Sequence, residues 1–242
     1  MVGREREQHE LLAAYDEDEA QLIAVYGRRR VGKTYLVRET FRDRFYFQHA
    51  WLAKGFMSEQ LSAFRDSLIH AGAAEVPELH NWREAFNALR TFIEAGGKRR
   101  KKVIFIDEMP WMDTPKSKFV MWFESFWNGW CSGRKDVVFI ICGSAASWIV
   151  KKVFHNKGGL YNRVTRQIRL LPFNLEVKYS NHPFVIDKNY DRQLRSKAGT
   201  FADVTKTRSA VHLTMITSNG LSHTGYWGTV QSEVTLDDLF RP

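Results

Sequence analysis

The sequence predicts an α/β fold in which helices flank a five-stranded, mainly parallel sheet. Short apolar runs alternate along the chain with segments whose apolar residues recur at helical spacing. The first run, residues 22–26, is apolar throughout, which is typical of a strand covered on both faces. The predicted strands are residues 22–26, 44–48, 103–107, 137–142 and 166–171.

Helices are predicted before and between these strands, at residues 7–15, 33–42, 58–71, 82–95 and 116–131. The last of these helices carries a stripe of aromatic residues on one face. We expect this stripe to belong to the core, with a protein interface as the alternative. Its members are Phe119, Trp122, Phe123, Phe126, Trp127 and Trp130.

Composition excludes several classes of protein. The chain has 242 residues and a net charge of +9, and 44% of its residues are hydrophobic, which excludes a disordered, collagenous or coiled-coil protein. Two cysteines, Cys131 and Cys142, are too few for a disulfide framework or a cysteine-based zinc site. The polar N-terminus and the lack of a long apolar run predict a soluble cytoplasmic protein with no membrane span.

Basic residues gather in two clusters, at residues 28–30 and 98–102. The second cluster directly precedes a strongly apolar predicted strand. It suits either a solvated loop that keeps this strand from aggregating or a contact with nucleic acid. The charge alone therefore leaves nucleic-acid binding open.

The strongest motif follows the first predicted strand, where residues 27–34 read GRRRVGKT and match the P-loop pattern GxxxxGK[ST] in full. Glycines let the loop curl so that its amides point at phosphate oxygens, and the following helix adds its positive N-terminus. Lys33 is expected to reach the β- and γ-phosphates, and the Thr34 hydroxyl to ligate Mg²⁺. The residues predicted to bind ATP here are Gly27, Arg28, Arg29, Arg30, Val31, Gly32, Lys33 and Thr34.

A second part of the site is predicted where the strand at residues 103–107 ends in Asp107 and Glu108. Asp107 is expected to position Mg²⁺, and Glu108 to act as the general base that activates water. The two motifs are separated by enough sequence for two strands. This spacing favours ATPases with an extra strand between the P-loop strand and the Mg²⁺ strand over small kinases and GTPases.

Two further polar residues are candidates for contact with the γ-phosphate. Ser144 follows the fourth predicted strand, at the sheet edge where ligands bind in α/β folds, although a simple turn would look the same. Arg163 suits an arginine finger that offsets charge in the transition state, with an ordinary surface arginine as the alternative. The histidines show no ligand spacing, so no metal besides Mg²⁺ is expected.

Several stretches together resemble a known family: GREXE near the start, VYGRRRVGKTYLVRE, VIFIDEMPWM, FIICGSAASW and LYNRVTRQIRLLPF. They are similar to the prokaryotic AAA-type ATP-binding proteins, which are common in gut Bacteroidetes and archaea. The resemblance implies a P-loop ATPase domain over residues 1–174 that hydrolyses ATP and often completes its site across subunits of an oligomer. Asn162 departs from this family, which usually has glycine before the arginine of this motif.

The tail, residues 175–242, resembles the far end of the same family, a restriction-endonuclease-like PD-(D/E)xK domain. Glu176 and Lys178 match the E-x-K half of its motif, in which a carboxylate binds Mg²⁺ and a lysine steadies water. The winged helix and the first half of the nuclease-like domain are missing from this sequence. We therefore expect residues 175–239 to form a helix and about three strands that pack against the first domain, without nuclease activity.

The sequence thus predicts an ATP-binding protein that hydrolyses ATP with Mg²⁺. Two alternatives from other classes remain. One is a DNA-binding or DNA-processing module that uses Glu176, Lys178 and the basic clusters. The other is a nucleotide-gated interaction protein that does not hydrolyse ATP and uses the aromatic helix as its contact.

Overall fold

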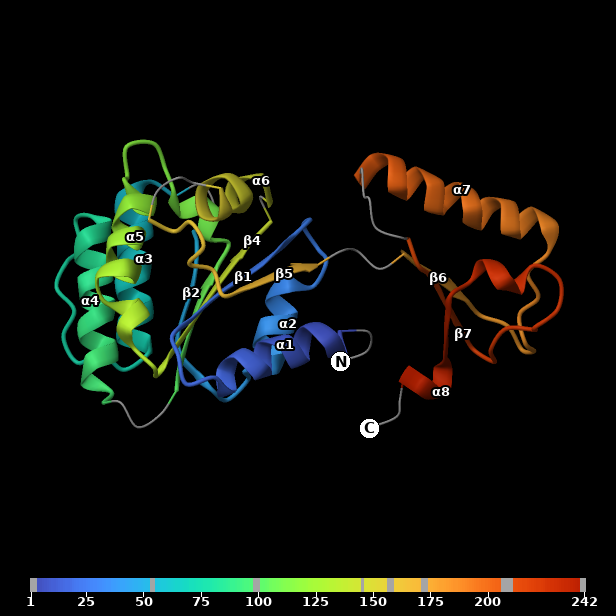
Figure 1. Cartoon of the computed structure of the whole chain (residues 1–242), viewed down its shortest axis with the longest axis horizontal. Helices are drawn as coiled ribbons and strands as arrows, with labels where there is room; N and C mark the ends of the chain where they lie inside the picture. Colours follow the sequence, from blue (N-terminus) through green and yellow to red (C-terminus); the bar gives the residue numbers. More distant parts are fainter. Residues whose placement is uncertain are drawn as a thin grey trace. The chain divides into compact units, whose positions relative to one another are not determined.

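The computed structural model describes residues 4–52, 55–97, 101–144, 146–155, 159–170, 174–205 and 211–239. Contacts within the chain divide it into two units, the first ending at about residue 171 and the second beginning at about residue 172 (Figure 1). Asn174, the last residue of the predicted first domain, begins a strand of the second unit. Among the described residues, none of the helices is long and apolar enough to cross a lipid bilayer.

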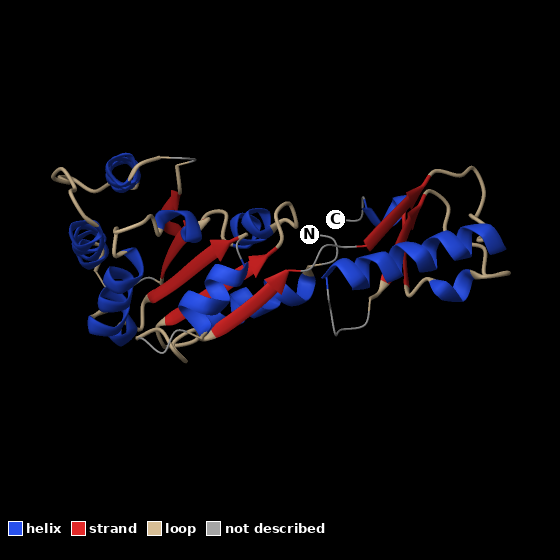
Figure 2. Ribbon diagram, turned by 90° about the horizontal axis from the view of Figure 1, so that it is seen from above, coloured by secondary structure: helices blue, strands red, loops and turns tan. Residues whose placement is uncertain are grey.

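The first unit is built on a five-stranded sheet in the order β2-β3-β4-β1-β5, and every neighbouring pair is parallel. Figure 2 shows these strands, in red, pointing the same way. The predicted fold class is confirmed, and β4 lies between β1 and β3, as the spacing of the two motifs predicted. The strands are β1 (Gln21–Gly27), β2 (Phe45–Ala50), β3 (Lys102–Asp107), β4 (Val137–Gly143) and β5 (Arg166–Leu170).

Helices cover both faces of this sheet, because the central strands are apolar on both sides. In β3 and β4 every residue is buried. Alternate residues of β1 face opposite layers: Ile23 packs with α1 (Glu5–Asp16) and α2 (Lys33–Thr40), and Leu22 packs with the helices of the other face. Those helices are α3 (Met57–His70), α4 (Trp82–Ala95) and α5 (Phe119–Gly129). Short helical segments complete the unit: η1 (Met109–Met112), η2 (Cys131–Gly133), α6 (Ala146–Ile149) and η3 (Val150–Phe154).

The aromatic stripe of α5 lies mainly in the core, as predicted. Four of its members are buried, and Trp122 and Trp130 are partly buried against the same cluster. The indole of Trp130 lies beside the guanidinium groups of Arg90 and Arg134, with distances of 5.4 and 5.1 Å to its centre. The buried members are Phe119, Phe123, Phe126 and Trp127.

The second unit has a smaller parallel sheet in the order β6-β7-β8. Its core joins residues of the middle strand and of the loops to Leu194 of a long helix. The predicted helix and three strands of the tail are confirmed. The elements are β6 (Asn174–Lys178), α7 (Lys188–Thr205), β7 (Leu213–Thr217), η4 (Trp227–Thr229), β8 (Ser232–Thr235) and α8 (Leu236–Leu239).

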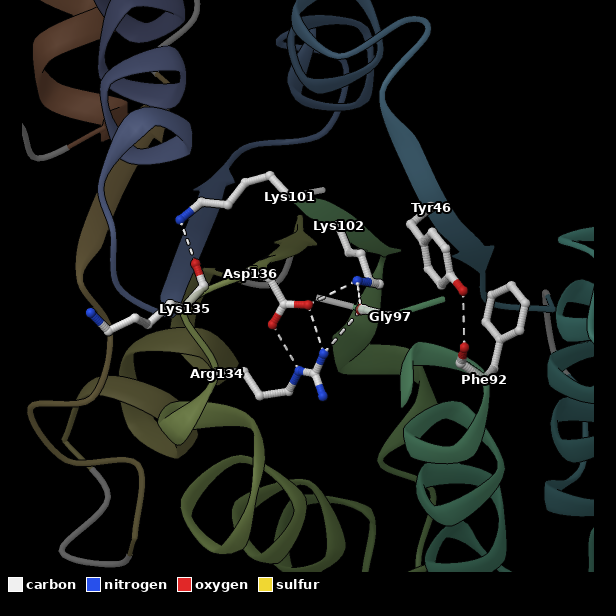
Figure 3. Close-up of polar contacts among 8 residues, drawn as sticks. All are labelled: Tyr46, Phe92, Gly97, Lys101, Lys102, Arg134, Lys135 and Asp136. Carbon is white, nitrogen blue, oxygen red and sulfur yellow. Dashed lines mark hydrogen bonds and ion pairs between the residues drawn. The ribbon is translucent and has the colours of Figure 1, made fainter. Parts of the chain in front are cut away.

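A buried charge cluster at the amino ends of β3 and β4 includes Lys102, a member of the basic segment at residues 98–102 (Figure 3). Lys102 is only 1% exposed, and its amine lies 2.8 Å from the carboxylate of Asp136, which Arg134 also binds through two nitrogens. Lys101 donates to the carbonyl oxygens of Glu17 and Lys135. These lysines are therefore structural, and the rest of the segment, residues 98–100, lies outside the described residues.

We expect Asp136→Ala to lower the free energy of unfolding by about 3–5 kcal/mol, because it leaves two buried cations without their shared carboxylate. Burial by itself would raise the pKa of Asp136, but hydrogen bonds from Arg134 and Lys102 outweigh burial and hold that pKa below its usual value. The matched control is Asp18→Ala, which removes an ion pair with Lys135 in which both side chains are exposed. In urea denaturation, this control should have the same free energy of unfolding as the wild type. Equal stability of Asp136→Ala would contradict the structural role of the cluster.

A second prediction concerns His49, a β2 residue whose ring accepts or donates one hydrogen bond with Ser67 and packs against Phe64. Burial lowers the pKa of His49 from 6.5 to about 4. The unfolded chain therefore binds more protons between these values, and the folded state loses stability as the pH falls. The burial of this residue should lower the free energy of unfolding by about 2 kcal/mol when the pH falls from 7 to 5.

Urea denaturation at both pH values tests this expectation. His49→Gln should reduce the pH-dependent loss, whereas His70→Gln, a change at an exposed position, should retain it. An unchanged loss in His49→Gln would show that other groups cause it.

Candidate functional site

The loop between β1 and α2 has a backbone that only glycine allows at its first residue. A Cβ on Gly27 would lie 2.1 Å from the carbonyl oxygen of Leu170, and the φ of Gly27 is 151°. Gly32, with φ of 84°, directly precedes the first residue of α2. Arg30 also has a positive φ, of 63°. A loop of this shape turns successive amides inward toward an anion, beside the positive end of a helix.

Lys33 places a positive charge within this loop. Its side chain is buried, and its amine donates a hydrogen bond of 2.8 Å to the carbonyl oxygen of Arg28. No carboxylate forms an ion pair with Lys33 among the described residues. The charge of Lys33 is therefore held by backbone oxygen alone, and an anion bound in the loop can compete for it.

Thr34 and Asp107 meet although they lie on different elements. The Thr34 hydroxyl at the start of α2 donates to Oδ2 of Asp107 at the end of β3, over 2.9 Å. The second oxygen of Asp107 accepts the amide of Glu108 at 3.0 Å. A hydroxyl and a carboxylate suit Mg²⁺, which takes oxygen ligands and usually keeps waters and substrate phosphates in its shell. The described residues contain no cluster of three or more metal-ligating side chains, so substrate oxygens and water would have to complete the shell.

The two cysteines are buried, as expected of reduced thiols. Burial raises the pKa of Cys142 well above its ordinary value, and the neighbouring carboxylate of Asp107 raises it further. Burial likewise raises the pKa of Cys131. Burial thus disfavours the thiolate form of both cysteines.

Glu108 has a left-handed backbone, with φ of 50° and ψ of 39°, which is uncommon for a residue other than glycine. Its carboxylate accepts hydrogen bonds from the backbone amide of Ser144, at 3.1 Å, and from the Ser144 hydroxyl, at 2.8 Å. Ser144 directly follows β4, so three neighbouring strands contribute to this site. The pairing of Glu108 with Ser144 was not predicted from the sequence.

Several of these groups line one cavity of about 510 Å³. Lys33, Thr34 and Glu108 line it, together with Tyr35 and residues that sequence reasoning missed. The missed residues are Trp51 and Trp111, whose rings stack with centroids 5.0 Å apart. Larger cavities lie elsewhere, one of about 1060 Å³ among the charged side chains of the amino edge. Size alone therefore does not identify the site; its chemistry does.

Arg4 is a further residue that was not given a role from the sequence. It is buried, and it donates to Glu7 at 2.9 Å and to the carbonyl oxygen of Val31 at 3.4 Å. The segment that begins the resemblance at residue 3 thus contacts the loop between β1 and α2. Only the fold brings these positions together, since they lie 27 residues apart.

Arg163 is not brought to this cavity. It is exposed and precedes β5, whose first residue, Arg166, pairs with Ile23 near the start of β1. Gly27 pairs with the last residue of β5, so Arg163 lies toward the opposite edge of the sheet. Asn162 has φ of 55°, a conformation that asparagine tolerates better than most residues.

The chain is similar to known proteins in sequence and in fold. A family model described as an ATPase domain predominantly from Archaea matches residues 1–197. The uncharacterised protein MJECL04 of Methanocaldococcus jannaschii is 27% identical over 179 residues, which are 72% of this chain and 36% of that protein. The chain thus spans about a third of the length of this relative.

Two solved structures are similar in fold. The Walker-type ATPase of Pyrococcus abyssi has a TM-score of 0.51 at 17% identity, over 85% of this chain and 59% of the other. Cdc6p of Pyrobaculum aerophilum has a TM-score of 0.47 at 12% identity, over 84% of this chain and 50% of the other.

In the second unit, the pairing of the strands determines which residues lie beside Glu176 and Lys178, the E-x-K residues. Glu176 pairs with Met215 on β7, which in turn pairs with Glu233 on β8. The neighbouring strand thus presents a buried methionine at this level. The amine of Lys178 lies 4.9 Å from the ring centre of Tyr190 on α7, and the side chain of Glu176 lies outside the described residues.

Three other carboxylates of the second unit have local partners. Asp187 accepts the amide of Tyr190 at 2.7 Å, and Asp191 binds Arg195 at 2.9 Å. Asp238 accepts the hydroxyl of Thr235 at 2.7 Å.

We therefore expect the purified full chain, incubated with Mg²⁺ or Mn²⁺, to leave single- and double-stranded DNA intact. A PD-(D/E)xK site needs a second carboxylate on the strand beside its E-x-K residues, and Met215 occupies that level. Gel electrophoresis of the DNA checks this. Cleavage by the wild type and by Lys188→Ala that is lost in Lys178→Ala would establish a nuclease.

Proposed function

The chain belongs to the family of ATPase domains found predominantly in Archaea, and from this premise we propose that it binds ATP with Mg²⁺ and hydrolyses it. The observation that carries the proposal is that Lys33, Thr34 and Glu108 line one cavity, and that Asp107 is hydrogen-bonded to Thr34 beside it. These groups come from segments that are far apart in sequence. Their types match the three needs of phosphoryl transfer, which are anion binding, metal binding and activation of water.

The loop at residues 27–34 holds the phosphates in this proposal. Its amides face the anion, which is why the backbone at Gly27 and Gly32 needs glycine. Lys33 exchanges its hydrogen bond to the Arg28 carbonyl for a charge-assisted contact with phosphate oxygens. Residues 28–31 contribute their backbone amides.

Mg²⁺ would be held by the Thr34 hydroxyl and positioned by Asp107. The hydroxyl oxygen of Thr34 and Oδ2 of Asp107 lie 2.9 Å apart. When bound, the ion neutralises charge on the β- and γ-phosphates. Asp107 is buried at the end of a buried strand, so its carboxylate has a fixed position. A carboxylate and a hydroxyl fixed in this way would offer Mg²⁺ two oxygen atoms.

Glu108 acts as the general base that takes a proton from the attacking water. Ser144 orients this carboxylate through the two hydrogen bonds that it donates. The Ser144 hydroxyl can instead donate to a γ-phosphate oxygen, so it couples the position of the base to the presence of ATP. Because both residues follow neighbouring strands, this coupling needs no movement of the sheet.

The arrangement also supports an AAA-type oligomer. The sheet order places β4 between β1 and β3, and Arg163 lies exposed away from the cavity of its own chain. An arginine in this position serves hydrolysis only by entering the site of a second subunit. The resemblance to AAA-type proteins favours such a homo-oligomer in the cytoplasm.

We expect Glu108→Gln to bind Mg-ATP with nearly wild-type affinity and to lose hydrolysis about a hundredfold or more, because the amide cannot accept a proton from water. Asp107→Asn should instead weaken Mg²⁺-dependent binding. Phosphate release and equilibrium titration measure the two effects. The exposed carboxylate of Glu94, which pairs with Arg90 on α4, offers the control Glu94→Gln. Equal hydrolysis by the wild type and Glu108→Gln would show that Glu108 only completes the end of the strand.

A nucleotide-gated interaction protein is the second candidate. Exposed apolar residues surround the cavity: Tyr35 is 60% exposed and Trp111 is 41% exposed, and both line it. Phe56, after β2, is 79% exposed. Tight binding of Mg-ATP without phosphate release by the wild type would select this function over hydrolysis.

A further inference from the structure

An arginine–tryptophan stack forms part of the cavity wall. Trp51 follows β2, and Trp111 lies in η1, just after Glu108. Their rings stack with 17° between the planes. The guanidinium carbon of Arg29, in the loop after β1, lies 5.4 Å from the centre of the Trp111 ring. Arg29, Trp51 and Trp111 line the same cavity as Lys33 and Glu108.

The stack restrains a side chain that would otherwise be free to move. Arg29 is exposed, and long exposed arginine side chains sample many rotamers. A guanidinium over an indole face is held by electrostatic attraction and by packing of two planar groups. Trp51 packs against Trp111 and so fixes the ring that holds Arg29.

Core packing does not account for Trp111. Its side chain keeps 41% of its surface exposed, although the buried core lies directly beneath η1 at Met109 and Met112. The contacts described for its ring are those with Arg29 and Trp51, both at the cavity wall.

Phosphoryl transfer needs positive charge near the γ-phosphate, since negative charge spreads over the γ-oxygens and the leaving oxygen in the transition state. Lys33 supplies one charge from within the loop. Arg163 of the same chain lies toward the other edge of the sheet. Arg29 is an arginine in the cavity wall whose guanidinium is held in place by a described contact.

We propose that Arg29 is a catalytic residue that contacts the γ-phosphate of ATP, and that Trp111, supported by Trp51, is its positioning residue. The inference rests on the proposed ATP hydrolysis. The water oxygen forms a bond to the γ-phosphorus as the bond from phosphorus to the bridging oxygen breaks, and the water proton passes to Glu108. The bond electrons stay on the oxygen of ADP. Arg29 keeps its protons and stabilises this developing negative charge.

The test compares kcat with the dissociation constants of ATP and ADP in single variants. Arg29→Gln should lower kcat about a hundredfold or more while ADP affinity stays within about twofold, since ADP lacks the γ-phosphate. Arg29→Lys should lose nearly as much, because an ammonium neither stacks on the indole nor forms a planar fork. Trp111→Leu should lower kcat about tenfold, and Trp111→Phe, which keeps a ring face, should stay within about threefold of wild type.

A double variant separates positioning from general damage. In the Arg29→Gln background, Trp111→Leu should cause no further loss of kcat, because Trp111 acts through Arg29. The matched control is Arg83→Gln, which removes a similar contact, 5.6 Å from the ring centre of Trp122, between α4 and α5. This control should hydrolyse ATP as the wild type does.

Several results would overturn the inference. If Arg29→Gln hydrolyses ATP as fast as Arg83→Gln, Arg29 is not catalytic, although the proposed hydrolysis stands. If the losses from Trp111→Leu and Arg29→Gln multiply in the double variant, Trp111 does not position Arg29. If the wild type releases no phosphate, both the inference and the proposed hydrolysis fail.

Discussion

The pairing of β4 between β1 and β3 is the constraint on which the rest of the first unit depends. Every residue of β4 is buried, so its backbone groups must find their partners in neighbouring strands. Because both pairings are parallel, the carboxyl ends of three strands meet at one edge. The loop after β1, the acidic pair after β3 and Ser144 after β4 therefore border one site. The hydrogen bond between Thr34 and Asp107 reaches across β4 to join the outer two of these strands.

The charged side chains at the two edges of the sheet have different kinds of partner. At the amino edge, Lys102, Arg134 and Asp136 satisfy one another in a buried cluster that holds the strand starts together. At the carboxyl edge, Lys33 is bonded to a backbone carbonyl, and Arg29 rests on an indole ring. Neither of these contacts neutralises a positive charge. At the carboxyl edge these two cations thus stay available to an anionic ligand, whereas the charges of the amino edge contribute to stability.

Local patterns predicted much of the fold and part of the site. The strand at residues 22–26 and the P-loop motif are contiguous in sequence, and the spacing of the two motifs predicted that one strand lies between β1 and β3. The contact of Trp51 with Trp111 could not be predicted in this way, because it depends on β2 pairing with β3. The burial of Lys102 was missed because a run of basic residues is usually solvated, and its partner Asp136 lies 34 residues away. The placement of Arg163 likewise depends on the register of β5.

The central claim is that the loop at residues 27–34 binds the phosphates of ATP together with Mg²⁺, and calorimetric titration of ATP tests it most directly. The account predicts that the wild type binds Mg-ATP, that EDTA weakens binding, and that Lys33→Ala weakens it about tenfold or more, since a charge-assisted contact is lost. Lys135→Ala, at an exposed position on the amino edge, should bind as the wild type does. Equal affinity of a folded Lys33→Ala variant and the wild type would contradict the account.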